Sequence, residues 1–283
     1  MGAPERPLTV DALAQFLAQL APLALAESWD NVGLLVGDRS RRVQRAMTCL
    51  TITPPVVAEA VRRQAELVIV HHPLPFQPLK RITADSTTGR MLLELIAAGV
   101  AVYSAHTAMD SAAGGINQQW AEALQLESIT PLQPLETNAS PKANASPKAN
   151  GPDAVLGAGR VGIPAAGETL QNLARRAQQA VAAASVRVVG DAEQRVRKVA
   201  IACGSGGSFL GAAARRGCDG LVTGEANFHA CLEARATGVG LILLGHFASE
   251  RFAMERLAEQ LAEQFPELDA WASEADRDPL WTL

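Results

Sequence analysis

The stretch Leu67–Pro73 constrains the fold of this chain most strongly. Its first four residues are apolar and three of them are β-branched, which predicts a short strand buried on both faces. His71 and His72 follow directly, and Pro73 ends the strand because proline has no amide hydrogen to donate. The histidine pair is therefore expected at the strand's carboxyl end, the edge where open α/β sheets bind ligands. A loop that happens to carry two histidines is the alternative.

A second strand end adds to this candidate site. Neighbouring residues on a strand point to opposite sides, so His71 and His72 suit two metal ions lying close together, one histidine to each. The predicted strand Val100–Ser104 leads to His106 and Asp110 at the same edge of the sheet. A hydrogen-bonded His106 and a solvated Asp110 are the alternative interpretation of these two residues.

A third predicted strand, Leu241–Leu244, runs into a helix that is expected to continue to Gln264. His246 and Glu250 are four residues apart, so they share one face of the first turn of that helix. The three strand ends thus supply nitrogen and oxygen donors without a thiolate. This donor set suits Zn, Mn, Fe, Co or Ni and differs from that of cysteine-rich structural zinc sites.

Two further strand ends carry polar motifs whose meaning stays open. Leu221–Gly224 is followed by Glu225 and, four residues on, by His229, and a helix beginning there would place both on one face. Spacing alone does not decide between a site pair and a surface pair. Gly204–Ser208 follows the predicted strand Val196–Cys203 and is interpreted as a tight turn, with a phosphate cradle as the alternative.

Strands and helices alternate along most of the chain, which favours βαβ units and a largely parallel sheet. The sequence Asn-Ala-Ser-Pro-Lys-Ala begins at Asn138 and is repeated from Asn144. This small, polar, proline-bearing stretch is too poor in apolar residues to form a core. It therefore predicts a flexible linker and a domain boundary.

Composition excludes several classes of function. The chain has 283 residues and a formal net charge of −4, so it lacks the basic excess of nucleic-acid-binding proteins. Its four cysteines are scattered without a C-x-x-C pair, which favours a reduced, cytoplasmic protein. Export and membrane insertion are not expected, because the sequence shows neither a signal-peptide pattern nor an apolar span of about 18 residues.

The motifs form an ordered set: Trp29–Gly33, His71–Pro73, His106–Asp110, Gly114–Asn117, Thr223–His229 and Gly245–Glu250. This set resembles the Nif-three-like proteins, also called GTP cyclohydrolase 1 type 2 homologs, over nearly the whole chain outside the repeat. The resemblance implies two α/β domains with largely parallel central sheets. It also implies a dinuclear metal site in a cleft at the strand carboxyl ends, and assembly as a ring-shaped homohexamer.

The resemblance also implies a ligand set for two divalent ions: His71 and Asp110 for one, His72 and His246 for the other, and Glu250 as the bridge. His106 would lie behind the ligands and orient one of them. The domains expected on this basis are residues 1–130 with 231–283, carrying the metal site, and an inserted domain at 153–230. Residues 131–152 would form the flexible linker.

Two classes of function follow from this resemblance. The first is a metal-dependent hydrolase acting on a nucleotide-like or phosphorylated small molecule. The second is a non-catalytic metal-binding protein with a regulatory or interaction role. For the hydrolase, Glu225, His229 and Asp30 are the candidate acid–base groups. For Trp29 and Asp30, turn chemistry and one packed indole are a simpler explanation than catalysis.

Overall fold

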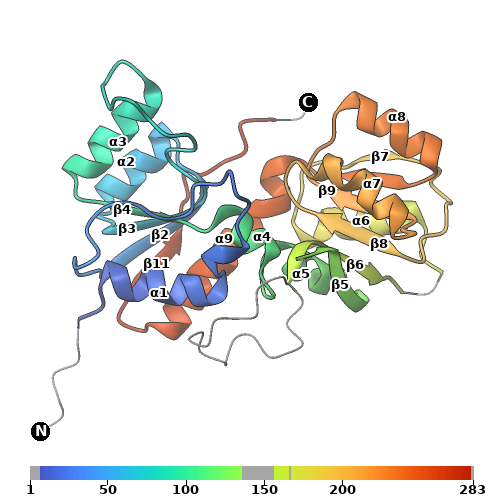
Figure 1. Cartoon of the computed structure of the whole chain (residues 1–283), viewed down its shortest axis with the longest axis horizontal. Coiled ribbons are helices and arrows are strands. Elements are labelled where there is room, and N and C mark those ends of the chain that lie inside the picture. The colour runs from blue at the N-terminus through green and yellow to red at the C-terminus, as the bar shows by residue number, and fades with distance from the viewer. Residues whose placement is uncertain (1–6, 136–155, 166, 282–283) are drawn as a thin grey trace, which may run out of the picture. The chain divides into compact units, whose positions relative to one another are not determined.

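The structure is a computed structural model of the chain, and it describes residues 7–135, 156–165 and 167–281 (Figure 1). The chain forms two compact units. Unit 1 comprises Met1–Ala108 with Ala253–Arg277, and unit 2 comprises Met109–Phe252 with Asp278–Leu283. Among the described residues, each unit contains one sheet together with helices, so the chain has the expected α/β architecture.

Unit 1 is built on a five-stranded sheet in the order β1-β4-β3-β2-β11. Its strands are β1 (Gly33–Val36), β2 (Arg45–Thr51), β3 (Leu67–His72), β4 (Ala101–Ser104) and β11 (Asp269–Ala272). β1 pairs antiparallel with β4, and the other neighbours pair in parallel. The carboxyl ends of β2, β3 and β4 therefore lie at one edge, where β3 ends in the predicted histidine pair.

The helices of unit 1 cover this sheet, and two of them begin at side-chain caps. They are α1 (Val10–Leu20), η1 (Leu23–Leu25), α2 (Pro54–Arg62), α3 (Thr87–Ala97), the first residues of α4 (His106–Ser111) and the later turns of α9 (His246–Gln264). The Thr9 hydroxyl accepts a hydrogen bond from Ala12 N, and the Ser86 hydroxyl accepts one from Gly89 N. Each cap satisfies an amide that the first turn of its helix leaves without a partner.

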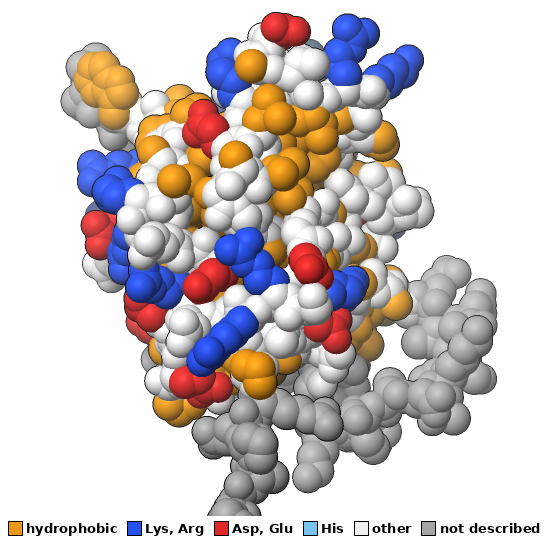
Figure 2. All heavy atoms as spheres, turned by 90° about the vertical axis from the view of Figure 1, so that its left-hand side faces the viewer, with side chains coloured by type: hydrophobic (Ala, Val, Ile, Leu, Met, Phe, Trp, Pro, Cys, Tyr) orange, Lys and Arg blue, Asp and Glu red, His pale blue; other side chains and the backbone are white. Residues whose placement is uncertain are grey.

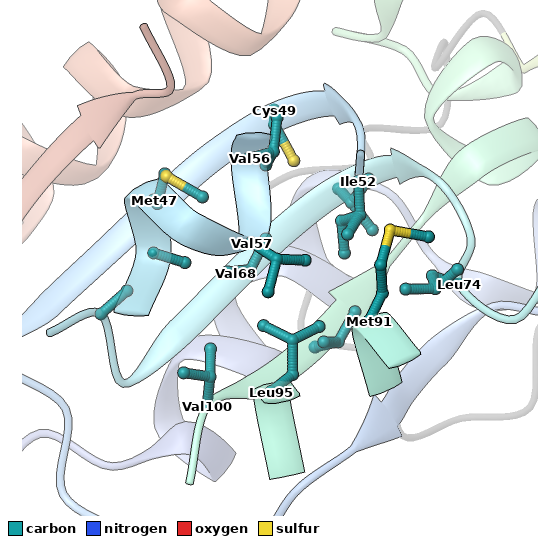
Figure 3. Packing of buried hydrophobic residues seen from close by; sticks show 14 of the residues in the cluster. Met47, Cys49, Ile52, Val56, Val57, Val68, Leu74, Met91, Leu95 and Val100 are labelled. Atoms are coloured by element: carbon teal, nitrogen blue, oxygen red, sulfur yellow. The ribbon is translucent and has the colours of Figure 1, made fainter. Parts of the chain in front are cut away.

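The core of unit 1 packs α2 and α3 against the parallel strands (Figure 3). Its buried side chains include Met47, Cys49, Val56, Val57, Val68, Val70, Leu92 and Leu95. Full burial of one such aliphatic side chain contributes about 1.5–3 kcal/mol. The apolar run that predicted β3 is thus buried, and it fixes the place of the histidines that follow it.

A buried carboxylate, Glu59, connects α2 to β11 and to the segment that follows β11. Its oxygens accept hydrogen bonds from Trp271 Nε1, at 3.1 Å, and Ser273 Oγ, at 2.6 Å. The backbone amides of Glu274 and Ala275 also donate to it. Burial would raise the pKa of Glu59, but these four hydrogen bonds outweigh burial and the pKa lies below its ordinary value.

Unit 2 is built on a six-stranded sheet in the order β5-β6-β8-β9-β10-β7. Its strands are β5 (Glu127–Pro134), β6 (Gly157–Ile163), β7 (Arg187–Val189), β8 (Val199–Ala202), β9 (Gly220–Thr223) and β10 (Gly240–Leu243). Its helices are α5 (Ile116–Ala123), α6 (Leu170–Ala180), η2 (Gly206–Phe209), α7 (Leu210–Arg215) and α8 (Phe228–Thr237), with parts of α4 and α9.

The parallel part of this second sheet is limited to β8, β9 and β10, which α7 and α8 connect in βαβ units. β5, β6 and β7 pair antiparallel with their neighbours. The expectation of a largely parallel sheet therefore applies to the centre of unit 2 and not to its edges. Adjacent strands that are connected by a crossover helix are parallel, whereas strands that are connected in other ways can pair antiparallel.

The compact units divide the chain at different positions from the predicted domains, whose boundaries stay a prediction. Residues 109–130 and 231–252, expected in the first domain, belong to unit 2. Pro131–Pro134, expected in the linker, belongs to β5. This strand is mostly exposed and lies at the sheet edge, where prolines are tolerated, so its sequence resembles a loop. The repeat Asn138–Asn150 lies outside the described residues.

The surface gives few clues to function. Among the helices of the described residues, none is long and apolar enough to cross a membrane. Figure 2 shows one side of the molecule, on which hydrophobic side chains gather among charged ones. On α2 and α3, the side chains of Val61, Leu93 and Ile96 are exposed. Exposed apolar residues are ordinary on folded proteins, so the polar clusters carry more information about function.

Candidate metal centre

Three histidines of unit 1 form a cluster at the carboxyl edge of its sheet. His71 and His72 end β3, and His106 begins α4. Their ring centroids are 5.0, 5.1 and 5.6 Å apart, and one nitrogen of each ring lies within 4.8 Å of the others. Three imidazoles at this spacing could hold one divalent ion. Although side chains alternate along a strand, the rings of His71 and His72 converge at the end of β3.

Two of these histidines are held through the Nδ1 nitrogen. His72 Nδ1 lies 2.7 Å from Thr51 Oγ1, and His106 Nδ1 lies 2.8 Å from Asp30 Oδ1. An oxygen partner at Nδ1 selects Nε2 as the nitrogen that would bind a metal. Metal-binding histidines in proteins are commonly oriented in this way.

Asp30 fixes the position of His106 from a fully buried side chain. Besides the imidazole, it accepts hydrogen bonds from the backbone amide and the hydroxyl of Thr107. Burial would raise the pKa of Asp30, but the bonds from Thr107 and His106 outweigh burial and lower it. The carboxylate therefore stays ionised at neutral pH. With Asn31 N, which donates to it at 2.8 Å, it has four donors, which fits a positioning role better than proton transfer.

Unit 2 carries a second polar cluster at the start of α9. His246 Nε2 lies 3.0 Å from Glu250 Oε2, so the predicted shared helix face is confirmed. On the other side of the ring, His246 Nδ1 lies 2.9 Å from Glu225 Oε1, which also accepts a hydrogen bond from Ser205 Oγ. One imidazole is therefore placed between two carboxylates.

These contacts set the charges of the second cluster. The hydrogen bond to Glu250 raises the pKa of His246 to about 9; burial opposes this effect and Glu225 adds to it. The bond from His246, followed by that from Ser205, lowers the pKa of Glu225. At neutral pH His246 is therefore protonated beside an ionised Glu225, an environment that favours a positive charge.

The glycine-rich turn before η2 approaches this cluster closely. Gly204 has φ +59°, a conformation that favours glycine. A Cβ atom there would overlap Glu250 Oε1 and lie 3.3 Å from His246 Nε2. A Cβ on Gly206 would lie only 2.5 Å from Thr223 Oγ1. The turn is thus explained by close backbone approach, and the carboxylates beside it disfavour the phosphate alternative.

Asp110, another predicted ligand, lies on α4 beside a thiol that the sequence analysis did not assign to the site. Asp110 Oδ1 is 3.3 Å from Cys203 Sγ. Asn117 connects the two residues, because its side chain donates to the backbone carbonyl of Asp110 and accepts from Cys203 N. Burial, and then the charge of Asp110, raises the pKa of Cys203 well above its ordinary value, so the sulfur stays a protonated donor. In the sequence, the only indication that Cys203 belongs near the site was its position at the end of a predicted strand, directly before the glycine-rich turn.

The predicted helical pairing of Glu225 with His229 is wrong. α8 begins at Phe228 with Asn227 as its cap, so Glu225 lies in the preceding loop. Glu225 contacts His246 instead, while His229 is exposed on the first turn of α8. Both residues line a pocket of about 730 Å³ together with the glycine-rich turn. Catalytic roles for Glu225 and His229 stay predictions.

An α/β protein with histidine and carboxylate clusters that could bind metal is the class defined by this fold and these contacts. Comparison with known proteins gives the family. The Duf34/NIF3 family (NGG1p interacting factor 3) matches residues 8–279, so the chain belongs to that family. This confirms the resemblance found in the sequence motifs.

Named relatives cover nearly the full chain. A Clostridium perfringens protein named GTP cyclohydrolase 1 type 2 homolog is 30% identical over 275 residues, covering 96% of this chain and 98% of the relative. NIF3-like protein 1 of Drosophila melanogaster is 33% identical over 276 residues, covering 96% and 88%. Most of each relative's length is therefore represented here.

Solved structures match the fold over almost the whole chain. A Bacillus cereus protein related to NIF3 superposes with a TM-score of 0.85 at 24% identity, covering 99% of this chain and all of that one. A Staphylococcus aureus protein superposes with a TM-score of 0.84 at 26% identity, covering 98% and 100%. The fold is thus that of known NIF3-related proteins.

Proposed function

We propose that this protein is a metal-dependent hydrolase acting on a nucleotide-like or phosphorylated small molecule. The observation that supports the proposal is the contact that several of its histidine rings make through Nδ1. Three of the five histidines of the chain have Nδ1 against an oxygen: His72, His106 and His246. Such an oxygen partner would direct Nε2 of the proposed ligands His72 and His246 at an ion, while His106 would orient a neighbouring ligand.

The proposed centre holds two divalent ions through five side chains: His71, His72, Asp110, His246 and Glu250. In this proposal His71 and Asp110 bind one ion, His72 and His246 bind the other, and Glu250 bridges. A shared carboxylate reduces the repulsion between two dications a few ångströms apart. The donor set of imidazoles and carboxylates fits Zn, Mn, Fe, Co or Ni.

When bound, such ions would lower the pKa of a water molecule and polarise the group under attack. Glu225 is a weak proton acceptor near neutral pH, because hydrogen bonds from His246 and Ser205 lower its pKa. Its contacts favour a role in orienting His246. His229, exposed in the adjacent pocket, is then the candidate acid–base residue, and Asp30 holds His106 in place.

The names of the relatives suggest the substrate. Several are called GTP cyclohydrolase 1 type 2 homolog, which favours a guanine nucleotide. In that reaction, water would attack the carbon between the two imidazole nitrogens of guanine and open the ring to a formamide. A second water would then hydrolyse the formamide and release formate. Phosphoester hydrolysis is equally compatible with the ligand set.

The test is turnover by protein loaded with each divalent metal in turn. GTP and a panel of phosphoesters are supplied, and formate and phosphate are measured. We expect product only with metal, loss of product after chelation, and recovery when metal is added back. Absence of any product from fully loaded protein would overturn the hydrolase proposal.

A non-catalytic metal-binding protein with a regulatory or interaction role is the second candidate. The family description, NGG1p interacting factor 3, favours it because it names an interaction and no reaction. Metal binding without turnover, together with capture of a protein partner, would support this candidate. The homohexamer and the cytoplasmic location stay predictions, and light scattering after size-exclusion chromatography tests the first.

A further inference from the structure

Two exposed aromatic side chains of unit 1 lie against the histidine cluster. The side chains of Trp29 and Phe76 are 61% and 48% exposed. Their ring centroids lie 6.1 and 6.0 Å from that of His106, which is itself 5.1 Å from His71. An exposed tryptophan costs solvation free energy, so a pair converging on one imidazole requires an explanation beyond packing.

Hydrogen bonds hold in place the backbone segments that carry Trp29 and Phe76. Asn31 Nδ2 donates to the carbonyl of Pro75 at 2.7 Å, which ties the turn carrying Trp29 to the segment carrying Phe76. Asp30 N donates to the carbonyl of Glu27 at 3.0 Å, and Glu27 N donates to Thr107 Oγ1 at 3.0 Å. Asp30 itself binds His106. The rings are therefore exposed but positioned in advance, which reduces the entropy lost when a ligand binds.

The arrangement of the rings indicates what they would bind. The centroids of Trp29 and Phe76 are 6.0 Å apart and their planes are tilted by 48°, so they form two walls at an angle and not a parallel slot. His106 meets both edge-on, at 77° and 76°. Such walls offer a face to one flat ring, whereas a phosphate gains little from an aromatic face.

We infer that Trp29 and Phe76 form a stacking subsite for the planar heteroaromatic ring of the substrate, such as a purine base. The inference rests on the proposed function, since it takes the histidine cluster to be half of the reactive centre. It also explains the Trp-Asp-Asn turn residue by residue. Trp29 stacks on the ring, Asp30 positions His106, and Asn31 joins the two aromatic segments.

The subsite is tested by binding of guanosine, with ribose as the probe that lacks the ring. Trp281 is also exposed, so Trp281→Phe serves as the background in which quenching of tryptophan fluorescence reports on Trp29. In this background, stacking should quench the fluorescence with guanosine and leave it unchanged with ribose. Binding is also measured by calorimetry in chains with native Trp281.

Trp29→Ala should weaken guanosine binding by roughly 5- to 150-fold, the range for loss of one base–aromatic stack. Phe76→Ala should weaken it by a smaller factor, and Trp29→Phe should retain most of the affinity. Trp281→Ala is the matched control and should bind as the wild type does. Bound metal, counted by mass spectrometry, should be unchanged in every variant.

Unchanged guanosine affinity in Trp29→Ala would overturn the subsite, and so would absence of guanosine binding to the metal-loaded wild type. The two proposals fail separately. Guanosine binding that depends on Trp29 without any hydrolysis would remove the hydrolase and retain the subsite. Hydrolysis of GTP with the same KM in the wild type and Trp29→Ala would retain the hydrolase and remove the subsite.

Discussion

The histidine cluster of unit 1 and the His246 cluster of unit 2 differ in the side chains that each brings together. The first gathers three imidazoles, with a buried carboxylate behind one of them. The second places one imidazole between two carboxylates. Neutral nitrogen donors set ligand geometry, whereas carboxylates supply the negative charge that a pair of dications requires. Imidazoles predominate in the first cluster and carboxylates in the second, so changes in the two should have different consequences.

The largest expected effect comes from the carboxylate cluster. Glu250→Ala should lower bound metal from two ions per chain and reduce turnover at least about a hundredfold, because a bridging ligand serves both ions. His71→Ala should mainly weaken the binding of one of the two ions. Mass spectrometry of the purified proteins counts the metal. Glu259→Ala, an exposed position on the same helix, is the matched control. Two ions retained in Glu250→Ala would disprove the bridge.

The next effect concerns the carboxylate behind the imidazoles. Asp30→Asn keeps the size of the side chain but removes its charge, so His106 loses its charged partner. We expect a loss of about 10- to 100-fold in metal affinity, as is typical when a group orienting a ligand is changed. Competition with a coloured chelator measures this affinity. Asp38→Asn, on an exposed carboxylate, should bind metal as the wild type does; equal affinities in both variants would show that Asp30 is only a turn residue.

A smaller effect is expected from the glycine-rich turn. Gly204→Ala places a methyl group against Glu250 and His246 at a positive φ, so that pair must shift. Metal affinity should fall by roughly tenfold while the fold persists. Gly211→Ala is the control, because its Cβ would meet nothing closer than 3.5 Å and helical alanine is favourable. If Gly204→Ala binds metal normally, close approach of the turn does not matter to the site.

Several elements could be predicted from sequence because one local rule decides each of them. The apolar run of β3, the helical spacing of His246 and Glu250, and the βαβ pattern through β8 and β10 all depend on periodicity. The candidate ligands at strand ends were proposed because residue type and position agreed.

Other features depend on partners distant in sequence. Asp30 binds His106 across 76 positions, and Cys203 donates to Asp110 across 93. No local pattern distinguishes such an aspartate from an ordinary turn residue. The failed pairing of Glu225 with His229 has the same origin. Asn227 caps α8 and starts it after Glu225, and a contact with His246 then determines the direction of that side chain.

The smallest effect on metal binding is expected from a change at Glu59. This change should lower the stability of the fold and leave the metal site intact. Glu59→Gln removes the charge that four donors surround, and each charged hydrogen bond is worth about 1.5–3 kcal/mol. Thermal unfolding should shift down by several degrees, whereas the number of bound ions should not change.

The pH dependence of this shift follows from the lowered pKa of Glu59. A depressed folded-state pKa stabilises the native chain above the unfolded value, about 4.5, and this contribution disappears as pH falls through the folded value. The difference in melting temperature between wild type and Glu59→Gln should therefore be full at pH 7 and shrink below pH 4.5. Calorimetry of the metal-free proteins over this range measures it. A difference that is constant with pH would mean that the charge of Glu59 contributes nothing, and that the shape of its hydrogen-bonded segment alone secures β11.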